Sequence, residues 1–547
     1  MCISRARINE IFLSKIIEIP GKKYRMKNVF LSFIILSLSF NYSFSQTDSA
    51  WKFAATITQQ GLKKQLTVIA SADMEGRETG TEGQRKAAAY IEKQFKEIGL
   101  KTPASLKVYQ QFYALLKDTL IPKTFKIGKK KYEFGTDYII TPGTDENSEF
   151  NARNIIFAGY GITDMNYDDY TGKDVKGKVV VIFPGEPSAG DTFLVSGTSK
   201  PSVWGRSINR KAILAKQKGA VALLVVNLKD DNIAALSSKL KTSNISLPGS
   251  NNVTEKVPVV TIAPYIIKNV FGTKGTELVA YARTGIPLKG FNAETNEKSK
   301  LVYKTIKTET SSSNVIGYIE GSDLKNEYVF LTAHYDHLGK KGNVIYYGAD
   351  DDGSGTASVI EMARAFAKAK ANGFGPRRTL VFMTVSGEEE GLWGSEYYSD
   401  HPAFSLDSTD VDLNTDMIGR IDPGRNYGDS MNYVYVIGND KLSTDLDPIS
   451  IAINKKYTKL ELDYKFNSPD DPERIYYRSD HYNFAKKGVP ILFFFDGIHK
   501  DYHKPTDTVD KINFDLMEKR ARFIFLTAWD IANRDKMLKR DLALPDK

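Results

Sequence analysis

The sequence predicts an α/β fold, in which a mixed sheet carries helices on both faces and a smaller β-rich module interrupts the chain. After residue 313, short and nearly continuous apolar runs alternate with helical stretches, as in sheets whose strands are buried on both faces. Between residues 116 and 300, strand-like runs are separated by loops rich in Gly, Ser, Pro and Asn. A chain of 547 residues is long enough for two or more domains. We therefore expect one domain built from residues 46–115 and 301–547, with an insert at 116–300.

The expected elements follow in chain order. Helical spacing of apolar residues between Leu62 and Leu100 indicates helices on either side of a Gly-rich loop at 74–81. That loop does not follow a strand as a phosphate-binding loop does, so we expect it to pack beside the active site. Strands are expected at 108–116, 154–160, 178–183, 220–226, 257–262, 329–333, 379–385, 411–415, 433–437 and 489–495, and helices at 210–218, 354–370, 446–456 and 514–534.

Composition excludes several classes of function. The net charge is +9, but residues 1–45 hold seven basic and two acidic residues, which leaves 68 basic and 64 acidic side chains in the remainder. So small an excess over some five hundred residues gives no case for nucleic-acid binding. The single cysteine, Cys2, excludes a disulfide framework and a thiol nucleophile in the rest of the chain, and leaves His and carboxylate as the metal ligands.

The N-terminus has the parts of a secretory signal. Met26 and Lys27 precede an apolar run at 29–40, and small polar residues follow it. We expect cleavage after Ser45, with residues 1–25 as an upstream extension. The alternative is a membrane anchor, but the apolar run is short for a bilayer span. The prediction is export to the periplasm or the extracellular space, without a stable membrane span in the mature chain.

Acids and histidines follow the predicted strands. In an open α/β sheet, the carboxyl ends of the strands line the ligand crevice, so side chains that follow different strands can meet there. His334 and Asp336 come after 329–333, a run of acids comes after 379–385, and Asp416 comes after 411–415. The strand at 489–495 is followed by Asp496, His499 and His503, and three aspartates, Asp350, Asp351 and Asp352, precede the helix at 354–370.

This set of residue types suits a pair of zinc ions. Zinc binds imidazole and carboxylate, and two ions close together share a bridging carboxylate. The inventory is sufficient for one ion at His334 and Asp416, a second at Glu389 and His503, and a bridge at Asp351. Glu388 is left beside a ligand, where it can accept and return a proton. Asp336, two residues after His334, can orient that imidazole.

Five segments carry a resemblance to a known family. They read AHYDHLG, GADDDGSGTA, SGEEEGLWGSEYY, NTDMIGR and DYHKPTDT. In order and approximate spacing they resemble the co-catalytic di-zinc aminopeptidases, a family that includes bacterial leucyl-type aminopeptidases, glutamate carboxypeptidase II and, more distantly, glutaminyl cyclases. The resemblance covers 313–530 well and 62–115 loosely. The insert, through YDDYTGKDVKGKVVVI and KAILAKQKGAVALLVV, is similar to a protease-associated domain.

The resemblance implies an α/β/α sandwich zinc exopeptidase domain with roles for particular residues. His334 and Asp416 match the ligands of one zinc, Glu389 and His503 match those of the other, and Asp351 matches the bridging aspartate. Glu388 matches the general base and Asp336 the aspartate behind the first histidine. Tyr502 matches a tyrosine that hydrogen-bonds the oxyanion in some members. The family often has a cis peptide after the bridging residue, here between Asp351 and Asp352.

Other polar residues near these segments have less specific interpretations. Asp350 and Asp352 are expected to be hydrogen-bonding supports, and Glu390 the exposed start of a helix. The residues His337, His401 and His499 are expected to be structural or on the surface. His481 is balanced between a structural role and the substrate pocket, and Arg474, Tyr477 and Arg478 are further candidates to reach substrate.

The predicted function is an exported di-zinc aminopeptidase that acts on peptides, with two Zn²⁺ as cofactors and no nucleic-acid partner. Three alternatives stay open. A carboxypeptidase or dipeptidase of the same fold would need a cationic pocket, which Arg474 or Arg478 could supply. A glutaminyl cyclase would use one zinc, and a non-catalytic relative would lack ligands. The sequence leaves open the preferred N-terminal residue, the oligomeric state and the position of the insert, which we expect to act as a lid.

Overall fold

The computed structural model describes residues 49–545, apart from 145–146, 166, 230–232, 234–235, 237–242, 249–254 and 285–291. The expected signal segment and its cleavage position lie outside the described residues. Among the residues that are described, no helix is long and apolar enough to cross a membrane.

The larger domain is built on a mixed sheet. β21, β18, β14 and β17 run parallel to one another, whereas β19 is antiparallel to β21 and β13 is antiparallel to β17. The strand order is β20 (Glu461–Asp463), β19 (Tyr433–Ile437), β21 (Ile491–Phe495), β18 (Thr409–Thr415), β14 (Leu324–His334), β17 (Arg378–Val385) and β13 (Glu294–Ile319). The predicted mixed sheet is thereby confirmed.

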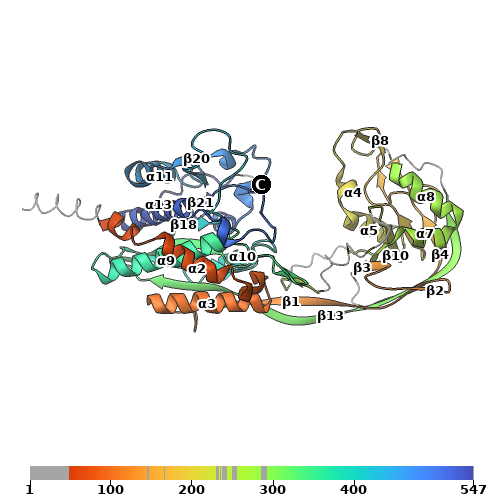
Figure 1. The fold of residues 1–547 in the computed structure, drawn as a ribbon, viewed down its shortest axis with the longest axis horizontal. Coiled ribbons are helices and arrows are strands. Elements are labelled where there is room, and N and C mark those ends of the chain that lie inside the picture. The colour runs from red at the N-terminus through yellow and green to blue at the C-terminus, as the bar shows by residue number, and fades with distance from the viewer. Residues whose placement is uncertain are drawn as a thin grey trace, which may run out of the picture.

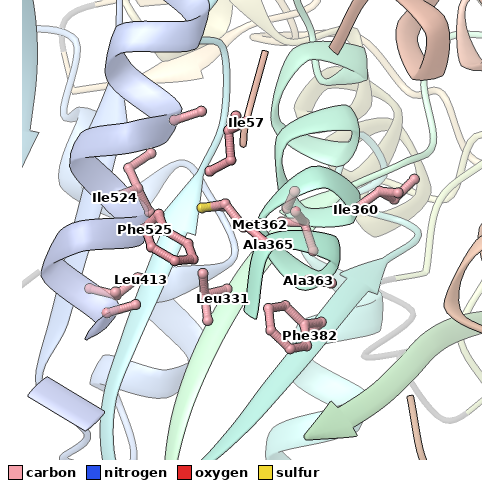
Figure 2. Packing of buried hydrophobic residues seen from close by; sticks show 14 of the residues in the cluster. Ile57, Leu331, Ile360, Met362, Ala363, Ala365, Phe382, Leu413, Ile524 and Phe525 are labelled. Carbon is pink, nitrogen blue, oxygen red and sulfur yellow. The ribbon is translucent and has the colours of Figure 1, made fainter. Parts of the chain in front are cut away.

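Helices cover both faces of this sheet. Successive strand residues point to opposite faces, so Leu331 joins the core on one face and Phe330 the core on the other. Figure 2 shows the first core, where Leu331, Phe382 and Leu413 of three neighbouring strands lie below two helices. These helices contact each other through Phe366 and Phe525, whose ring centroids are 4.1 Å apart. The first face is covered by α2 (Gln59–Ile69), α3 (Glu82–Ile98), α9 (Gly353–Ala371) and α13 (Phe514–Asn533), and the second by α10 (Trp393–Asp400) and α12 (His481–Ala485). α11 (Leu446–Ile453) packs against α13.

Two long strands lead out of this domain to the insert. β1 (Gln110–Ile127) pairs with β13 in antiparallel register from Gln110↔Val315 to Ile127↔Ser299, and this ribbon runs from the larger domain on the left of Figure 1 to the insert on the right. The positions expected as domain boundaries, 115/116 and 300/301, therefore fall inside two continuous strands.

The insert has a sheet and an apolar core of its own. From β13, the sheet continues through β4 (Asn147–Phe157), β7 (Val179–Ile182), β10 (Ala222–Val226), β12 (Val259–Ile262) and β3 (Tyr138–Thr141). Short strands beside β1 and in loops are β2 (Lys130–Tyr132), β5 (Thr163–Asp164), β6 (Tyr167–Asp168), β8 (Ser188–Ala189), β9 (Thr192–Phe193) and β11 (Ser243–Ser246). Aromatic side chains from several strands, among them Phe125, Tyr138 and Phe157, fill its core.

The expectation of a single short helix in the insert is wrong. The predicted helix is present as α5 (Ile208–Gln217), which follows the one-turn α4 (Val203–Arg206). The structure adds α7 (Pro264–Phe271) and α8 (Thr273–Thr284). α7 begins with Pro264 at its first turn and buries Ile266, Ile267 and Val270. This is the apolar spacing of an amphipathic helix with a helix-starting proline, a signal that the sequence contained.

Candidate metal centre

The carboxyl ends of the four parallel strands meet at one edge of the larger sheet. His334 is the last residue of β14, Asp416 directly follows β18, and Glu388 and Glu389 lie in the turn after β17. His503 is in the segment between β21 and α13. Because parallel strands end together, four segments that are distant in sequence bring acids and imidazoles to one place.

The first group of donor atoms consists of His334, Asp351 and Asp416. Nε2 of His334 lies 3.3 Å from Oδ1 of Asp351 and 3.5 Å from Oδ1 of Asp416. All three residues are buried and their donor atoms are close enough to hold one metal ion. Glu388 stands beside this group, with Oε2 3.9 Å from the same nitrogen.

The second group shares Asp351 with the first. Nε2 of His503 lies 3.1 Å from Oδ2 of Asp351 and 3.1 Å from Oε2 of Glu389. Asp351 thus offers Oδ1 to one group and Oδ2 to the other, which is the arrangement of a bridging carboxylate. The structure brings together all five residues that were expected to be ligands.

A second histidine, His337, lies in the second group, which was not expected. His337 was predicted to be structural or on the surface, but its side chain has no exposed area, and Nδ1 lies 2.7 Å from Oε1 of Glu389 and 3.8 Å from Oδ2 of Asp351. Its donor atoms form a candidate metal group with those two carboxylates. The sequence held one signal for it, because His337 follows the predicted ligand His334 by three residues in the same segment.

Unpartnered buried atoms indicate that this cluster is built for cations. The side-chain atoms His334 Nε2, His337 Nδ1, Asp351 Oδ2 and Glu389 Oε1 are buried and have no hydrogen-bond partner. Buried polar atoms are rarely left in this state, because the loss of hydration is costly. Imidazole and carboxylate are the donors that zinc prefers in the absence of cysteine. The residues present therefore fit two zinc ions.

The pKa shifts of the acidic and imidazole groups also indicate a site for cations. Burial raises the pKa of Glu388 well above its usual value; His334 opposes this, and the negative charges of Asp416 and Glu389 add to it. Burial lowers the pKa of His503, but the adjacent carboxylates of Asp351 and Glu389 outweigh it and raise that pKa to about 10. A pocket of carboxylates with this much mutual repulsion needs positive charge among them.

Comparison with known proteins identifies this part of the chain. Residues 314–528 match Peptidase family M28. This part of the chain is an M28 peptidase domain. Aminopeptidase YwaD of Bacillus subtilis (strain 168) is 24% identical over 348 residues, 60% of this chain and 66% of that protein. A probable leucine aminopeptidase of Trichophyton verrucosum is 30% identical over 211 residues, 37% of this chain and 54% of that protein.

Solved structures share the fold of most of the chain. An aminopeptidase from Aneurinibacillus sp. strain AM-1 superposes with a TM-score of 0.54 at 21% identity, covering 91% of this chain and 98% of that one. BSAP, a zinc aminopeptidase from Bacillus subtilis, gives a TM-score of 0.54 at 20% identity, covering 89% and 99%.

In the M28 domain, the aspartates on either side of Asp351 fix the backbone around it. Asp352 accepts hydrogen bonds from the backbone N–H of His334 (3.2 Å) and of Met417 (3.1 Å), so it ties two ligand-bearing loops together. Asp350 accepts from the N–H of Gly419 at 2.7 Å. Both supports are as predicted, and the peptide between Asp351 and Asp352 is cis, as the resemblance implied.

Asp336 holds the centre in a different way from that expected. Nδ1 of His334 lies 3.2 Å from the carbonyl oxygen of Asp336 and 3.6 Å from its carboxylate, so the backbone makes the closer contact. The carboxylate instead accepts hydrogen bonds from the hydroxyl of Thr79 (2.8 Å) and from the N–H of Glu388 (3.3 Å). The Thr79 hydroxyl also accepts from the N–H of Gly387 at 2.9 Å. The Gly-rich loop therefore packs beside the candidate metal centre.

A small cavity opens on the first group of donors. Asp351, Glu388 and Asp416 line it on one side, and the opposite walls are Met417, Ile475, Arg478, Ser479, Phe493, Phe495, Ile498 and Tyr502. Arg478 donates a hydrogen bond to the Tyr502 hydroxyl at 3.3 Å. The Tyr502 ring stacks on the His503 ring, with centroids 3.9 Å apart.

The remaining candidates lie outside this cavity. His481 is buried behind its wall, where it stacks on Phe493 (centroids 4.6 Å apart) and contacts the carbonyl of Tyr476 through Nε2 at 2.8 Å. Arg474 lies over the Tyr477 ring. His499 is buried 3.3 Å from Asp350, a structural position, and His401 is exposed at the end of α10. Glu390 lies in the turn before α10, not at the start of a helix as expected, and is partly buried.

Proposed function

We propose that this protein is an exported di-zinc aminopeptidase that removes N-terminal residues from peptides. The observation that carries the proposal is the pair of donor groups that share Asp351, with the carboxylate of Glu388 beside them. Relatives that are named aminopeptidases support it. In this proposal His334 and Asp416 hold one zinc, Glu389 and His503 hold the other, and Asp351 bridges them. Zinc bound there would polarise the scissile carbonyl and make a coordinated water more acidic.

Glu388 is the proposed general base. It lies on the cavity wall next to Asp416 and Asp351, within reach of a water that attacks a carbonyl in the cavity. It would take a proton from that water and return it to the leaving amine. The hydrogen bond from its own N–H to Asp336 holds the turn in place.

Tyr502 is the proposed donor to the oxyanion. Its hydroxyl faces the same cavity, and burial raises its pKa, so it keeps the proton that it donates. Arg478 contacts that hydroxyl and would hold it in position.

A carboxypeptidase or dipeptidase of the same fold is the second candidate. Arg478 lines the cavity and could bind a substrate carboxylate, whereas Arg474 does not line it. Against this, Arg478 already pairs with Glu473 at 3.3 Å. Hydrolysis of aminoacyl amides, dipeptides and C-terminal glutamate peptides, each with zinc present and chelated, separates the two candidates. The aminopeptidase proposal fails if only substrates with a free C-terminal carboxylate are cleaved.

Export and the role of the insert belong to the same proposal. We propose that residues 1–45 are removed on export to the periplasm or beyond, and that residues 116–300 are a protease-associated-like module that shapes access for substrates. N-terminal sequencing of the exported protein tests the first part: a mature chain that begins near Gln46 is expected, and a retained N-terminus would contradict it.

The Glu388→Ala variant tests the chemistry. We expect it to keep two zinc ions per chain and to lose about 10²- to 10⁴-fold in kcat, which is the usual contribution of a positioned acid–base group. Zinc content by elemental analysis and turnover of an aminoacyl amide are the measurements. Glu390→Ala, which alters the neighbouring acid, is the matched control and keeps its activity. Unchanged turnover in Glu388→Ala would refute the base, and a wild-type chain without zinc would refute the centre.

A further inference from the structure

His337 is held rigidly among the donor atoms of the second group. Its ring packs directly on the backbone of Gly348, where an added Cβ would lie 2.5 Å from the ring atoms Cγ and Cδ2. Its backbone N–H is bonded to the carbonyl of Arg77 at 3.3 Å. The side chain has no exposed area. The direction of the ring is therefore set by the fold and not by solvent.

Neither ring nitrogen of His337 has a hydrogen-bond partner. Nδ1 lies only 2.7 Å from Oε1 of Glu389, yet both atoms remain without a hydrogen bond. Two buried donor atoms this close together, neither of them with an aligned hydrogen bond, can serve as ligands of a common ion.

The donor atoms of the four residues in the second group are spaced closely enough to ligate one zinc ion, with Glu389 presenting one carboxylate oxygen to each histidine. Bonds of about 2.0–2.1 Å at tetrahedral angles separate neighbouring ligand atoms by about 3.3 Å. Nε2 of His503 lies 3.1 Å from Oδ2 of Asp351 and 3.1 Å from Oε2 of Glu389. Nδ1 of His337 lies 3.8 Å from the same oxygen of Asp351 and 2.7 Å from the other oxygen of Glu389, Oε1. These four distances scatter around the tetrahedral value.

We infer that His337 is a direct ligand, through Nδ1, of the second zinc ion, an inference that rests on the proposed function. That ion then has four protein ligands, namely His337, Asp351, Glu389 and His503. The first ion has three, His334, Asp351 and Asp416. Zinc sites with four protein ligands are closed, whereas a site with three keeps a position open for water or substrate.

The cavity agrees with this division of roles. Its walls include Asp351 and Asp416 of the first group and Glu388, but neither His337, Glu389 nor His503. Substrate therefore reaches the first ion, and the second ion is an anchored partner. The consequence is a second ion that is bound more tightly than the first.

A competing explanation is that His337 only orients Glu389 by donating a hydrogen bond. His337→Asn separates the two, because its amide nitrogen occupies the place of Nδ1 and donates a hydrogen bond, but is a poor zinc ligand. His337→Ala removes both functions. His401→Asn replaces an exposed histidine and is the matched control. Zinc affinity is measured by competition with a chelator, and elemental analysis gives the number of ions per chain.

We expect the wild type and His401→Asn to bind two zinc ions, one more tightly. In both His337 variants, the affinity for the more tightly bound zinc ion falls by more than about 100-fold. This exceeds the 10- to 100-fold loss that is usual when a residue that only orients a ligand is replaced. Tight binding in His337→Asn within threefold of the wild type would overturn the inference. A wild type that binds fewer than two ions would instead refute the proposed function.

A measurement on the wild type keeps the inference testable if a variant does not fold. Zinc X-ray absorption of the loaded chain counts imidazole ligands. If His337 is a ligand, we expect three imidazole ligands for the two zinc ions. Only two imidazole ligands would overturn the inference. Equal melting temperatures of the metal-free wild type and variants establish that the variants fold.

Discussion

Two of the six histidines in the sequence show how the groups around an imidazole ring set its pKa. His503 lies between two carboxylates that raise its pKa to about 10 against the effect of burial. His481 lies in an apolar wall, where burial lowers its pKa to about 3 although its bond to the Tyr476 carbonyl acts in the opposite direction. His503, once it has lost its proton, can bind a cation together with these carboxylates. His481 carries no charge in the folded protein near neutral pH.

His481 makes the folded protein sensitive to acid. Above pH 6.5 it is neutral whether folded or unfolded, so it has no effect on stability there. Between pH 6.5 and about 3 the unfolded chain binds a proton that the folded chain does not, so stability falls as pH falls. The loss is about 2 kcal/mol at pH 5.

His481→Gln removes the titrating group and can still donate to the Tyr476 carbonyl. We expect its free energy of unfolding to fall less than that of the wild type between pH 7.5 and 5, measured by urea denaturation of metal-free protein. Contributions of other groups cancel in the difference between the two proteins. Parallel pH profiles for wild type and variant would contradict the assignment.

Among the elements, the Gly-rich loop holds the candidate metal centre together although it contributes none of the candidate ligands. The 3₁₀ helix η1 (Ala72–Arg77) ends in a buried arginine whose guanidinium donates to the backbone carbonyls of Ile69, Tyr335, Tyr347 and Gly348. Two residues later Thr79 bridges Asp336 and Gly387. The loop thus joins the end of β14 to the turn that carries Glu388 and Glu389.

Thr79→Val tests this bridge. The substitution keeps the shape but removes the hydroxyl from the hydrogen-bond network, so the turn after β17 loses its support. We expect roughly a tenfold loss in kcat, with two zinc ions retained. Thr79→Ser keeps the hydroxyl and should recover most of the activity. Equal activity of the Val and Ser variants would show that the bridge does not position the base.

The sequence predicted those elements whose own residues carry the signal. β19 and β17 are apolar on both faces and agree with prediction to within a residue. β1 was predicted too short and β13 was missed, because exposed polar residues separate the few buried side chains in their outer halves. Pairing with each other is what makes these segments strands. The five residues proposed as ligands were singled out because five segments together are specific, and the structure places them close to one another. The sequence did not establish the position of His337, because only the tertiary packing around Gly348 turns its ring toward Asp351 and Glu389.

At the level of the whole molecule, the apolar core of the M28 domain and that of the insert are connected through the two strands β1 and β13. The buried residues of the M28 domain cluster on the two faces of its sheet, and those of the insert form separate clusters that include Phe125 and Val180. Since each core is buried within its own part of the chain, unfolding of one does not require unfolding of the other.

We therefore expect two transitions in scanning calorimetry, only one of which depends on zinc. Ligands that bind the folded state raise the stability of the domain that holds them, so chelation should lower the transition of the M28 domain and leave that of the insert in place. Phe125→Ala, in the core of the insert, should lower the melting temperature of the insert, because it reduces the free energy of unfolding by about 3–5 kcal/mol. Phe382→Ala is the corresponding variant in the core of the M28 domain. A single transition that shifts with either variant and with zinc would show instead that the ribbon couples the two cores into one cooperative unit.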